Sequence, residues 1–293
     1  MIPILLHLGP ITIYSYGLMM ALGFLAADFV IAIECRRRGI TTEFSSAVVV
    51  WAAIAGLAGA RLLDIFNNLQ AYLADPKAII FSGSGFVWYG GLIGGIGAAY
   101  LVSRYFKIRF AVTADMCAPA LAIGQAIGRI GCQLSGDGDW GAISKLPWAM
   151  AYPHAIVGWI GRNVAAIGPH NQLIYPFPPD APVPAGVRVH PAPVYETILY
   201  LIVFAILWSM RRRTKIDGRL FYLYLMLAGA SRFAVEFVRI NPRVALGLSE
   251  AQFIAIVMMV VGAGAWFASG TRTASRTPGD GREPARREQA VGA

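Results

Sequence analysis

The chain has 293 residues, of which 57% are hydrophobic and only 14% are charged, and its formal net charge is +9. Soluble globular domains contain roughly 45–50% apolar and about 25% charged residues, so this composition predicts an integral membrane protein. The basic residues lie in short clusters between apolar segments, as membrane topology signals do, and we therefore expect no nucleic-acid partner.

The N-terminus and the metal-binding residue types set two further expectations. Met1-Ile2-Pro3 lacks the basic region of a cleavable signal, so we expect the first apolar segment to remain as a membrane span. The three cysteines and four histidines show neither metal nor redox spacing. We expect no cofactor and no metal ion.

Seven apolar segments are each near the length that crosses a hydrocarbon core of roughly 30 Å at about 1.5 Å per residue. They are residues 11–33, 46–66, 86–105, 111–134, 194–210, 220–238 and 251–268. The expected fold class is an all-α integral membrane protein with a bundle of seven transmembrane helices.

Clusters of Lys and Arg follow the first, third, fifth and seventh segments. These are Arg36, Arg37 and Arg38; Arg104, Lys107 and Arg109; Arg211, Arg212, Arg213, Lys215 and Arg219; and Arg272, Arg276, Arg282, Arg286 and Arg287. With seven spans, all four clusters fall on one side, which the positive-inside rule makes the cytoplasm. The N-terminus is then outside the cell and the C-terminus inside.

The segments between the spans predict the domain organisation. Residues 1–269 form a polytopic membrane domain, with a modest external loop at 67–85. Residues 139–193 are too rich in proline for a long helix, so we expect a small irregular external head there. Residues 270–293 are polar and rich in Arg, Gly and Pro, which predicts a disordered cytoplasmic tail.

Glycines recur at small-x-x-x-small spacing in the third and fourth segments. The pairs are Gly90 and Gly94, Gly91 and Gly95, and Gly124 and Gly128. This spacing lets helix backbones approach closely in lipid, and it favours helix packing here over nucleotide binding.

Arginines inside apolar segments carry the strongest functional signal. Each costs about 2.5–3.5 kcal/mol at a helix centre, so Arg61, Arg129 and Arg232 each need a partner. The commonest anion in a bilayer is a lipid phosphate. Several intramembrane arginines therefore indicate a site for an anionic lipid.

The segment 128–141, GRIGCQLSGDGDWG, is the densest polar site. Its polar residues crowd the outer end of the fourth span, where the glycines predict that the helix ends. Irregular backbone at membrane depth occurs where it is buried in protein or lines a wet cavity. We therefore expect a binding cavity formed with Arg129, Cys132, Gln133, Ser135, Asp137, Asp139 and Gly141.

Two other charged groups allow two interpretations each. Arg232 and Glu236 share a helix face with Arg239, either as an internal ion pair or with Glu236 orienting Arg232 towards a phosphate. Arg61 and Asp64 share a face of the second segment, where a structural or lipid-positioning role is as favoured as a catalytic one.

Tyrosines and a tryptophan lie at the outer ends of the first and third segments. Tyr14, Tyr16, Trp88 and Tyr89 are typical of an aromatic belt at the membrane interface. Their neighbouring glycines also allow the hydroxyl groups to point inward, towards a lipid headgroup.

Taken in order, these motifs resemble those of the bacterial prolipoprotein diacylglyceryl transferases. The matching segments are 14–19 (YSYGLM), 59–62 (GARL), 89–94 (YGGLIG), 128–131 (GRIG), 147–153 (PWAMAYP), 190–196 (HPAPVYE) and 232–239 (RFAVEFVR). Differences from the family pattern fall in the polar site. Tyr89 replaces a histidine, Cys132 and Ser135 replace asparagines, and Ala228 replaces a tyrosine.

The resemblance implies transfer of the diacylglyceryl group from phosphatidylglycerol to the lipobox cysteine thiol of a prolipoprotein. A thioether forms and glycerol phosphate leaves, as the first step of lipoprotein maturation. The partners implied are phosphatidylglycerol, lipobox-containing signal peptides and membrane lipids.

The resemblance also assigns roles to site residues. Arg129 and Arg232 would stabilise the phosphate leaving group, and Tyr89 and Glu236 would complete the catalytic set. The base that ionises the thiol stays open between Tyr89, Asp137, Asp139, Glu236 and the arginine field itself. The substrate-binding residues expected are Tyr14, Tyr16, Arg61, Cys132, Ser135, Asp137, Asp139, Gly141 and Arg239.

Two alternatives remain. One is a non-catalytic or re-purposed relative that binds anionic lipid or precursor peptide, which the differences at Tyr89 and Cys132 favour. The other is a transporter or channel whose arginines line a path, although the sequence shows no internal repeat of the kind many transporters contain.

Overall fold

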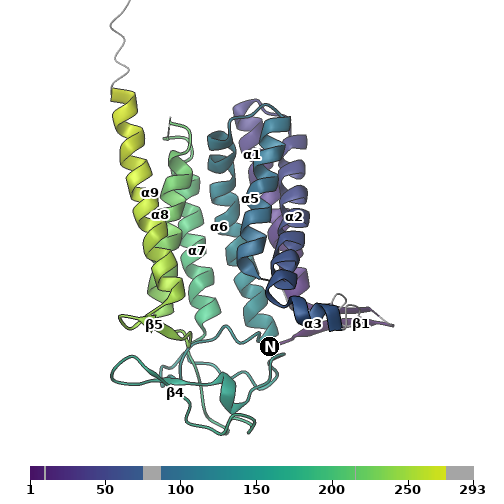
Figure 1. Ribbon diagram of the computed structural model, residues 1–293, viewed down its shortest axis with the longest axis vertical. Helices are drawn as coiled ribbons and strands as arrows, with labels where there is room; N and C mark the ends of the chain where they lie inside the picture. Colours follow the sequence, from purple (N-terminus) through teal and green to yellow (C-terminus); the bar gives the residue numbers. More distant parts are fainter. Residues whose placement is uncertain (10, 75–86, 215, 275–293) are drawn as a thin grey trace, which may run out of the picture.

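The computed structural model of the protein describes residues 1–9, 11–74, 87–214 and 216–274. Long helices dominate this part of the chain (Figure 1). They are α1 (Ser15–Arg38), α2 (Glu43–Asn67), α5 (Trp88–Tyr105), α6 (Phe110–Ser135), α7 (Ala192–Met210), α8 (Arg219–Glu236) and α9 (Glu250–Ala274). Each of the seven predicted apolar segments corresponds to one of these helices, which confirms the all-α class.

Five of the long helices, α1, α2, α6, α7 and α9, are long and apolar enough to cross a membrane by length and composition. The other two have more polar sequences. α5 is rich in glycine and aromatic residues, and α8 carries Arg219, Arg232 and Glu236. The composition and the helices together identify an integral membrane protein.

The prediction that the first span begins at residue 11 is wrong. Residues 11–14 form the strand β2 (Ile11–Tyr14), which pairs antiparallel with β1 (Ile4–Leu8), and the helix α1 begins only at Ser15. The residues of this hairpin are as apolar as those of a span, so hydropathy alone did not separate them. Their β-branched side chains on both sides of Gly9 favour extended backbone.

Other short elements connect the helices. These are α3 (Leu69–Ala74), the 3₁₀ turn η1 (Gly161–Asn163), β3 (Ala166–Ile167), β4 (Leu173–Ile174), β5 (Arg243–Ala245) and β6 (Leu248–Ser249). The predicted loop at 67–85 contains α3, and its remainder lies outside the described residues. α9 extends to Ala274, into the predicted tail, whose remaining residues also lie outside the described part.

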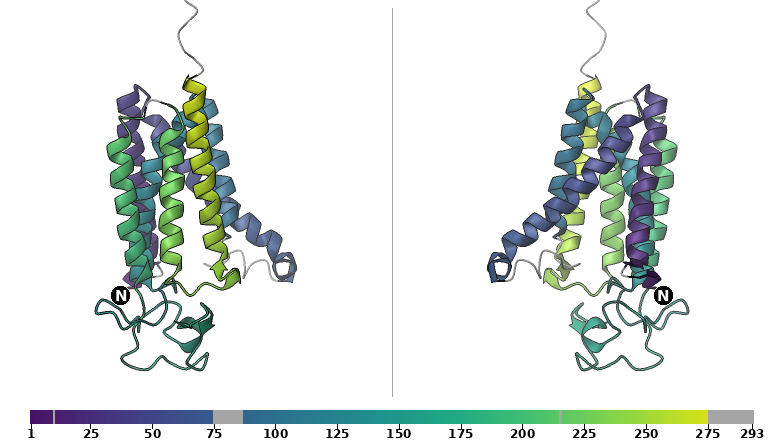
Figure 2. Two further views of the ribbon diagram at one scale, coloured as in Figure 1. Left: turned by 90° about the vertical axis from the view of Figure 1, so that its left-hand side faces the viewer. Right: turned by 90° about the vertical axis from the view of Figure 1, so that its right-hand side faces the viewer.

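The helices pack chiefly against their neighbours in a row. α5 lies on α2, α1 on α6, α7 on α6 and α8, and α9 on α8. Figure 2 shows α2 inclined, so that its end next to α3 stands away from the bundle. The head and the N-terminus lie at one end, and the connections after α1, α5 and α7 lie at the other (Figure 1).

Glycines bring α2 and α5 into backbone contact, as their spacing predicts. A Cβ atom on Gly90 would collide with the carbonyl oxygen of Gly59, and one on Gly94 with that of Ala55. Gly124 faces Gly23 of α1 less closely, since a Cβ atom on Gly124 would lie 3.7 Å from the Gly23 carbonyl oxygen, an ordinary van der Waals contact. Gly128 differs, because nothing lies within 4 Å of its Cβ position.

The head is held together by aromatic packing. Trp140 and Tyr152 are each 1% exposed, their ring centroids lie 4.8 Å apart, and the Trp140 indole N–H donates to the Asn163 carbonyl at 2.8 Å. Val164 and Val189 complete this small core. The segment is irregular, as its proline content predicts, and it lies directly against the ends of α6, α7 and α8 (Figure 1).

Candidate active site

An ion-pair network joins the head-side ends of α6, α7 and α8. It contains equal numbers of positive and negative groups, and we call it the arginine network. Its members are Arg129, Arg232, Arg239, Asp139, Glu196 and Glu236. Because the formal charges cancel, the ion pairs offset the cost of removing these charged groups from water, a cost that unpaired buried arginines would leave uncompensated.

Glu196 of α7 is the central carboxylate. It is 2% exposed, and it lies 2.5 Å from Nε of Arg129 and 2.6 Å from Nη1 of Arg232. Nη1 of Arg239 lies 3.7 Å away. One carboxylate therefore fixes the mutual positions of three guanidinium groups, which come from α6, from α8 and from the segment that follows α8.

Glu236 holds the second corner of the network. Its Oε2 lies 3.0 Å from Nη2 of Arg232 one helical turn earlier, which confirms the predicted shared face. Its Oε1 accepts hydrogen bonds from Asn241 at 2.6 Å and Ser249 at 2.8 Å. Glu236 is fully buried and held by Asn241 and Ser249, so its contact with Arg232 fixes the orientation of that guanidinium group.

Asp139 closes the network from the head side. It pairs with Arg129, and its Oδ1 lies 2.5 Å from Nη2 of Arg239. Burial alone would raise the pKa of Asp139, but the charges of Arg239 and Arg129 outweigh it and lower the pKa to about 2. Asp139 is therefore ionised throughout the physiological range.

Gly141 allows the Asp139 segment to lie this close to Arg239. Its N–H donates to the carbonyl of His190 at 2.8 Å, and it forms an isolated antiparallel bridge with Arg239. A Cβ atom at this position would collide with the Val238 carbonyl oxygen and lie 2.9 Å from Cβ of His190. Only glycine fits between these two strips of backbone.

We expect Gly141→Ala to lower both thermal stability and the activity proposed below, because the added methyl group pushes Asp139 away from Arg239. The measurement is the midpoint of thermal unfolding in detergent together with turnover. Gly97→Ala is the matched control, since nothing lies within 4 Å of that Cβ position in α5. Equal behaviour of the two variants would contradict this role for Gly141.

Within the 128–141 segment, Arg129 contacts Cys132 and Asp139. α6 ends at Ser135, and Gly136 caps it in the left-handed conformation (φ 63°). Cys132 Sγ lies 3.8 Å from Nη1 of Arg129, and the Asp137 carboxylate accepts the backbone N–H of Asp139 at 3.2 Å. Burial, followed by the charge of Asp139, raises the pKa of Asp137.

The ligand atoms of Cys132, Asp137 and Asp139 lie within 4.8 Å of one another, a spacing compatible with a metal ion. Arg129 and Arg239 already pair with Asp139, however, and a cation at this position would meet two positive charges. The chemistry of this group therefore fits the ion-pair network better than a metal centre.

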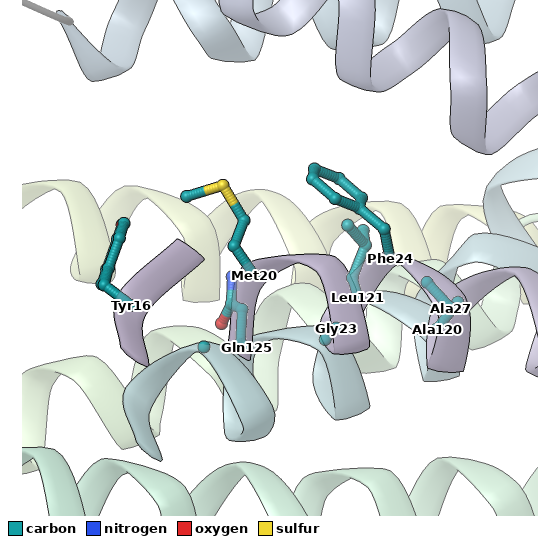
Figure 3. Close-up of a pocket in the computed structure, with 10 residues that line it drawn as sticks. Tyr16, Met20, Gly23, Phe24, Ala27, Ala120, Leu121 and Gln125 are labelled. Carbon is teal, nitrogen blue, oxygen red and sulfur yellow. The ribbon is translucent and has the colours of Figure 1, made fainter. Parts of the chain in front are cut away.

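An apolar cavity of about 220 Å³ opens between α1 and α6 (Figure 3). Tyr16, Met20 and Phe24 line it from α1, and Leu121 and Gln125 from α6. The α1 backbone at Tyr16 also packs on Gly131, with 3.5 Å between Tyr16 Cα and the Gly131 Cβ position, and Gly131 is next to Cys132 and two residues from Arg129. One end of the cavity therefore lies near Arg129 along α6.

The structure places the other predicted site residues farther from the network. Tyr14 is exposed at the start of α1, opposite Ile4 of the hairpin. Arg61 lies on α2, with its guanidinium over the Tyr72 ring, and Asp64 accepts the Tyr72 hydroxyl at 2.8 Å. These two residues belong to the inclined end of α2, not to the arginine network.

Tyr89, at the start of α5, donates its hydroxyl to Glu250 at the start of α9. Both side chains are exposed, and the partner of Tyr89 is a carboxylate. The contact joins two helices that otherwise pack on different neighbours, α2 and α8.

Glu196 is the site residue that the sequence reasoning did not single out. It lies within an apolar segment, where a carboxylate is as costly as an arginine, and that cost was the available signal. Ser249 and Asn241 carried no such signal, because polar residues between helices are common.

Comparisons with known proteins agree with this geometry. The sequence model of the family described as prolipoprotein diacylglyceryl transferase matches residues 3–268. A phosphatidylglycerol–prolipoprotein diacylglyceryl transferase of Clostridium tetani is 31% identical over 262 residues, covering 89% of this chain and 94% of that protein. Proteins of the same name from Geobacter sulfurreducens (32% over 270 residues) and Methylococcus capsulatus (34% over 278 residues) each cover 89% of this chain and 92% of their own length. The chain therefore belongs to the prolipoprotein diacylglyceryl transferase family.

Proposed function

We propose that this protein transfers the diacylglyceryl group from phosphatidylglycerol to the cysteine thiol of a prolipoprotein. The observation that carries the proposal is the arginine network, in which three guanidinium groups converge at the head-side end of the bundle. The names of the relatives state the same lipid and protein substrates. Membership of the family and the apolar helices support a multi-pass protein of the cell membrane.

The leaving group of this reaction is a phosphate ester, and its developing charge needs fixed cations. Arg129 and Arg232 are held by Glu196, so they can stabilise this charge with little rearrangement. The entering phosphate takes the place of Asp139, whose side chain is 31% exposed. Glu196 and Glu236 stay in place, because both are buried and lie on helices. Displacing Asp139 frees Arg129 and Arg239 together.

The acyl chains of the lipid require an apolar path beside the phosphate. The cavity between α1 and α6 provides one, because its Tyr16 end adjoins the turn that contains Arg129. Gly128 lines the same cavity and leaves open space where a larger residue would project. We assign this cavity to the lipid substrate.

Of the candidate acceptors for the thiol proton, Asp137 is favoured. Its pKa is raised by burial and by Asp139, so it accepts a proton more readily than Asp139, whose pKa is about 2. Glu236 is engaged by Ser249, Asn241 and Arg232. The substrate cysteine would then lie near Cys132 and Ser135, in the space next to Asp137.

The proposal includes the finer topology. We infer seven spans, with the head at 139–193 outside the cell and the C-terminal end of α9 on the cytoplasmic side. The four basic clusters at the C-terminal ends of α1, α5, α7 and α9 and in the residues after them support this orientation.

The experiment uses purified protein, phosphatidylglycerol and a lipobox peptide in nanodiscs. Release of glycerol phosphate with a diacylglyceryl mass gain on the peptide is the expected result. A folded protein that binds lipid or peptide without release would instead support the second candidate, a non-catalytic relative. The replacement of the family histidine by Tyr89, and its bond to Glu250, is the observation that favours that candidate.

Tyr89→Phe is expected to lower turnover severalfold, because it removes the hydroxyl at this position while keeping the ring. The measurement is the initial rate of glycerol phosphate release. Tyr105→Phe is the matched control, since Tyr105 lies at the opposite end of α5 and is 83% exposed. Full activity of Tyr89→Phe would leave Tyr89 as an interfacial aromatic anchor.

A further inference from the structure

A second ion-pair cluster lies at the end of the bundle opposite the head. We call it the Glu34 cluster, and it consists of Glu34, Arg37, Arg38 and Arg211. The Glu34 carboxylate lies 2.5 Å from Nη2 of Arg37, 3.7 Å from Nε of Arg38 and 3.0 Å from Nε of Arg211. It joins the C-terminal end of α1 to the residue that follows α7.

The charges of this cluster do not balance. Glu34 is 1% exposed and is shared by three guanidinium groups. A second carboxylate, that of Asp115, interacts electrostatically with Arg38. Asp115 is itself engaged by the backbone N–H groups of Gly218 and Phe221. Three cations and two anions leave one positive charge in excess.

Fixed geometry accompanies this excess charge. Nε of Arg38 and Nε of Arg211 are buried against the Glu34 carboxylate, at 3.7 and 3.0 Å. The Arg211 guanidinium carbon lies 3.4 Å from the centroid of the Trp208 ring, and Nη1 of Arg211 donates to the Trp208 carbonyl at 2.6 Å. The guanidinium groups are therefore already positioned, and a ligand would not have to order them.

The depth of the cluster indicates what the ligand is. α1 and α7 are both able to cross a membrane, and the cluster lies where they end, at Arg38 and Met210. Phe29 of α1 and Ile202 of α7 lie just over two helical turns inside those ends, and they are 64% and 50% exposed, as lipid-facing side chains are. The cluster thus lies at the level of lipid headgroups, next to acyl chains.

We propose that the Glu34 cluster binds the phosphate of an anionic phospholipid in the leaflet on the side opposite the head. A phosphodiester carries one negative charge, which neutralises the excess of the cluster and accepts hydrogen bonds from Arg37, Arg38 and Arg211. This site is distinct from the arginine network at the other end of the bundle, and it binds lipid without reacting with it.

The test compares two neighbouring arginines in the full-length protein. The reference protein carries Arg129→Ala alone, so that lipid at the arginine network does not contribute. This protein and its two derivatives with Arg211→Gln or Arg212→Gln added are delipidated and titrated with phosphatidylglycerol, and bound lipids are counted by native mass spectrometry. Arg212 is exposed and lies outside the cluster, so it controls for general positive charge. We expect roughly tenfold weaker binding for Arg211→Gln and an unchanged affinity for Arg212→Gln.

Further arms keep the proposal falsifiable. Arg37→Gln carries the same expectation, and Arg37 is 30% exposed, so this variant folds even if Arg211→Gln does not. Phosphatidylcholine, which has a phosphate but no net charge, should bind more weakly than phosphatidylglycerol. Equal weakening by Arg211→Gln and Arg212→Gln, or no weakening by Arg37→Gln, would overturn the site. Displacement of the lipid by excess sodium phosphate would overturn its assignment to a lipid headgroup.

Discussion

Arg129→Ala is expected to abolish diacylglyceryl transfer, with turnover reduced by about a hundredfold or more. Arg129 contacts both the buried carboxylate of Glu196 and the more exposed carboxylate of Asp139, and its Nε lies 2.5 Å from Glu196. Arg239 shares these two partners, but it lies farther from Glu196, at 3.7 Å. Arg129 is therefore the cation best placed to pass from an internal partner to the phosphate of the substrate. Removing it takes away positive charge where negative charge develops, and the other two arginines of the network remain held by Glu196, Glu236 and Asp139.

The same reasoning applies to Arg232→Ala, although Arg232 is oriented by two carboxylates, Glu196 and Glu236. Turnover is measured as glycerol phosphate release, and thermal unfolding is followed for each variant so that loss of fold is recognised. Arg162→Ala is the control, because Arg162 pairs with Asp180 on the surface of the head and is 57% exposed. Near-normal turnover of either Arg129→Ala or Arg232→Ala would remove the phosphate-clamp mechanism.

The sequence predicted the helices well, and the reasons are physical. A span needs a fixed length of apolar residues, so seven such segments located seven helices within a few residues of their ends. The end of α6 followed from the glycines at 128–138, and the Arg232–Glu236 pair followed from its spacing along one helix. These features depend on local sequence alone.

Features that depend on how distant segments meet were not predictable in this way. Glu196 bridges Arg129 and Arg232 only because α7 lies between α6 and α8. The position of Glu196 in the sequence does not indicate which helices pack on either side of α7. The Tyr89–Glu250 bond joins residues 161 positions apart. The hairpin of β1 and β2 was not predicted, because its residues are as apolar as those of a membrane span.

Glu196→Ala is expected to destabilise the protein by about 3–5 kcal/mol, the usual cost of breaking a buried ion pair from one side. The substitution leaves Arg129, Arg232 and Arg239 facing each other with only Asp139 and Glu236 to balance them. Glu43→Ala is the matched control, since Glu43 is an exposed acid in the first turn of α2 and its removal costs at most about 1 kcal/mol. The measurement is the free energy of unfolding in a denaturant titration in micelles.

A double variant separates charge balance from chemistry. Glu196→Gln together with Arg232→Gln removes one charge of each sign, so the network is neutral again, and part of the stability lost in Glu196→Ala should return. Activity should not return, because the phosphate then meets one cation fewer and Arg129 has lost its buried anchor. Recovery of both stability and turnover would mean that the network serves the fold alone, and the chemistry would have to be sought elsewhere along the head-side end of the bundle.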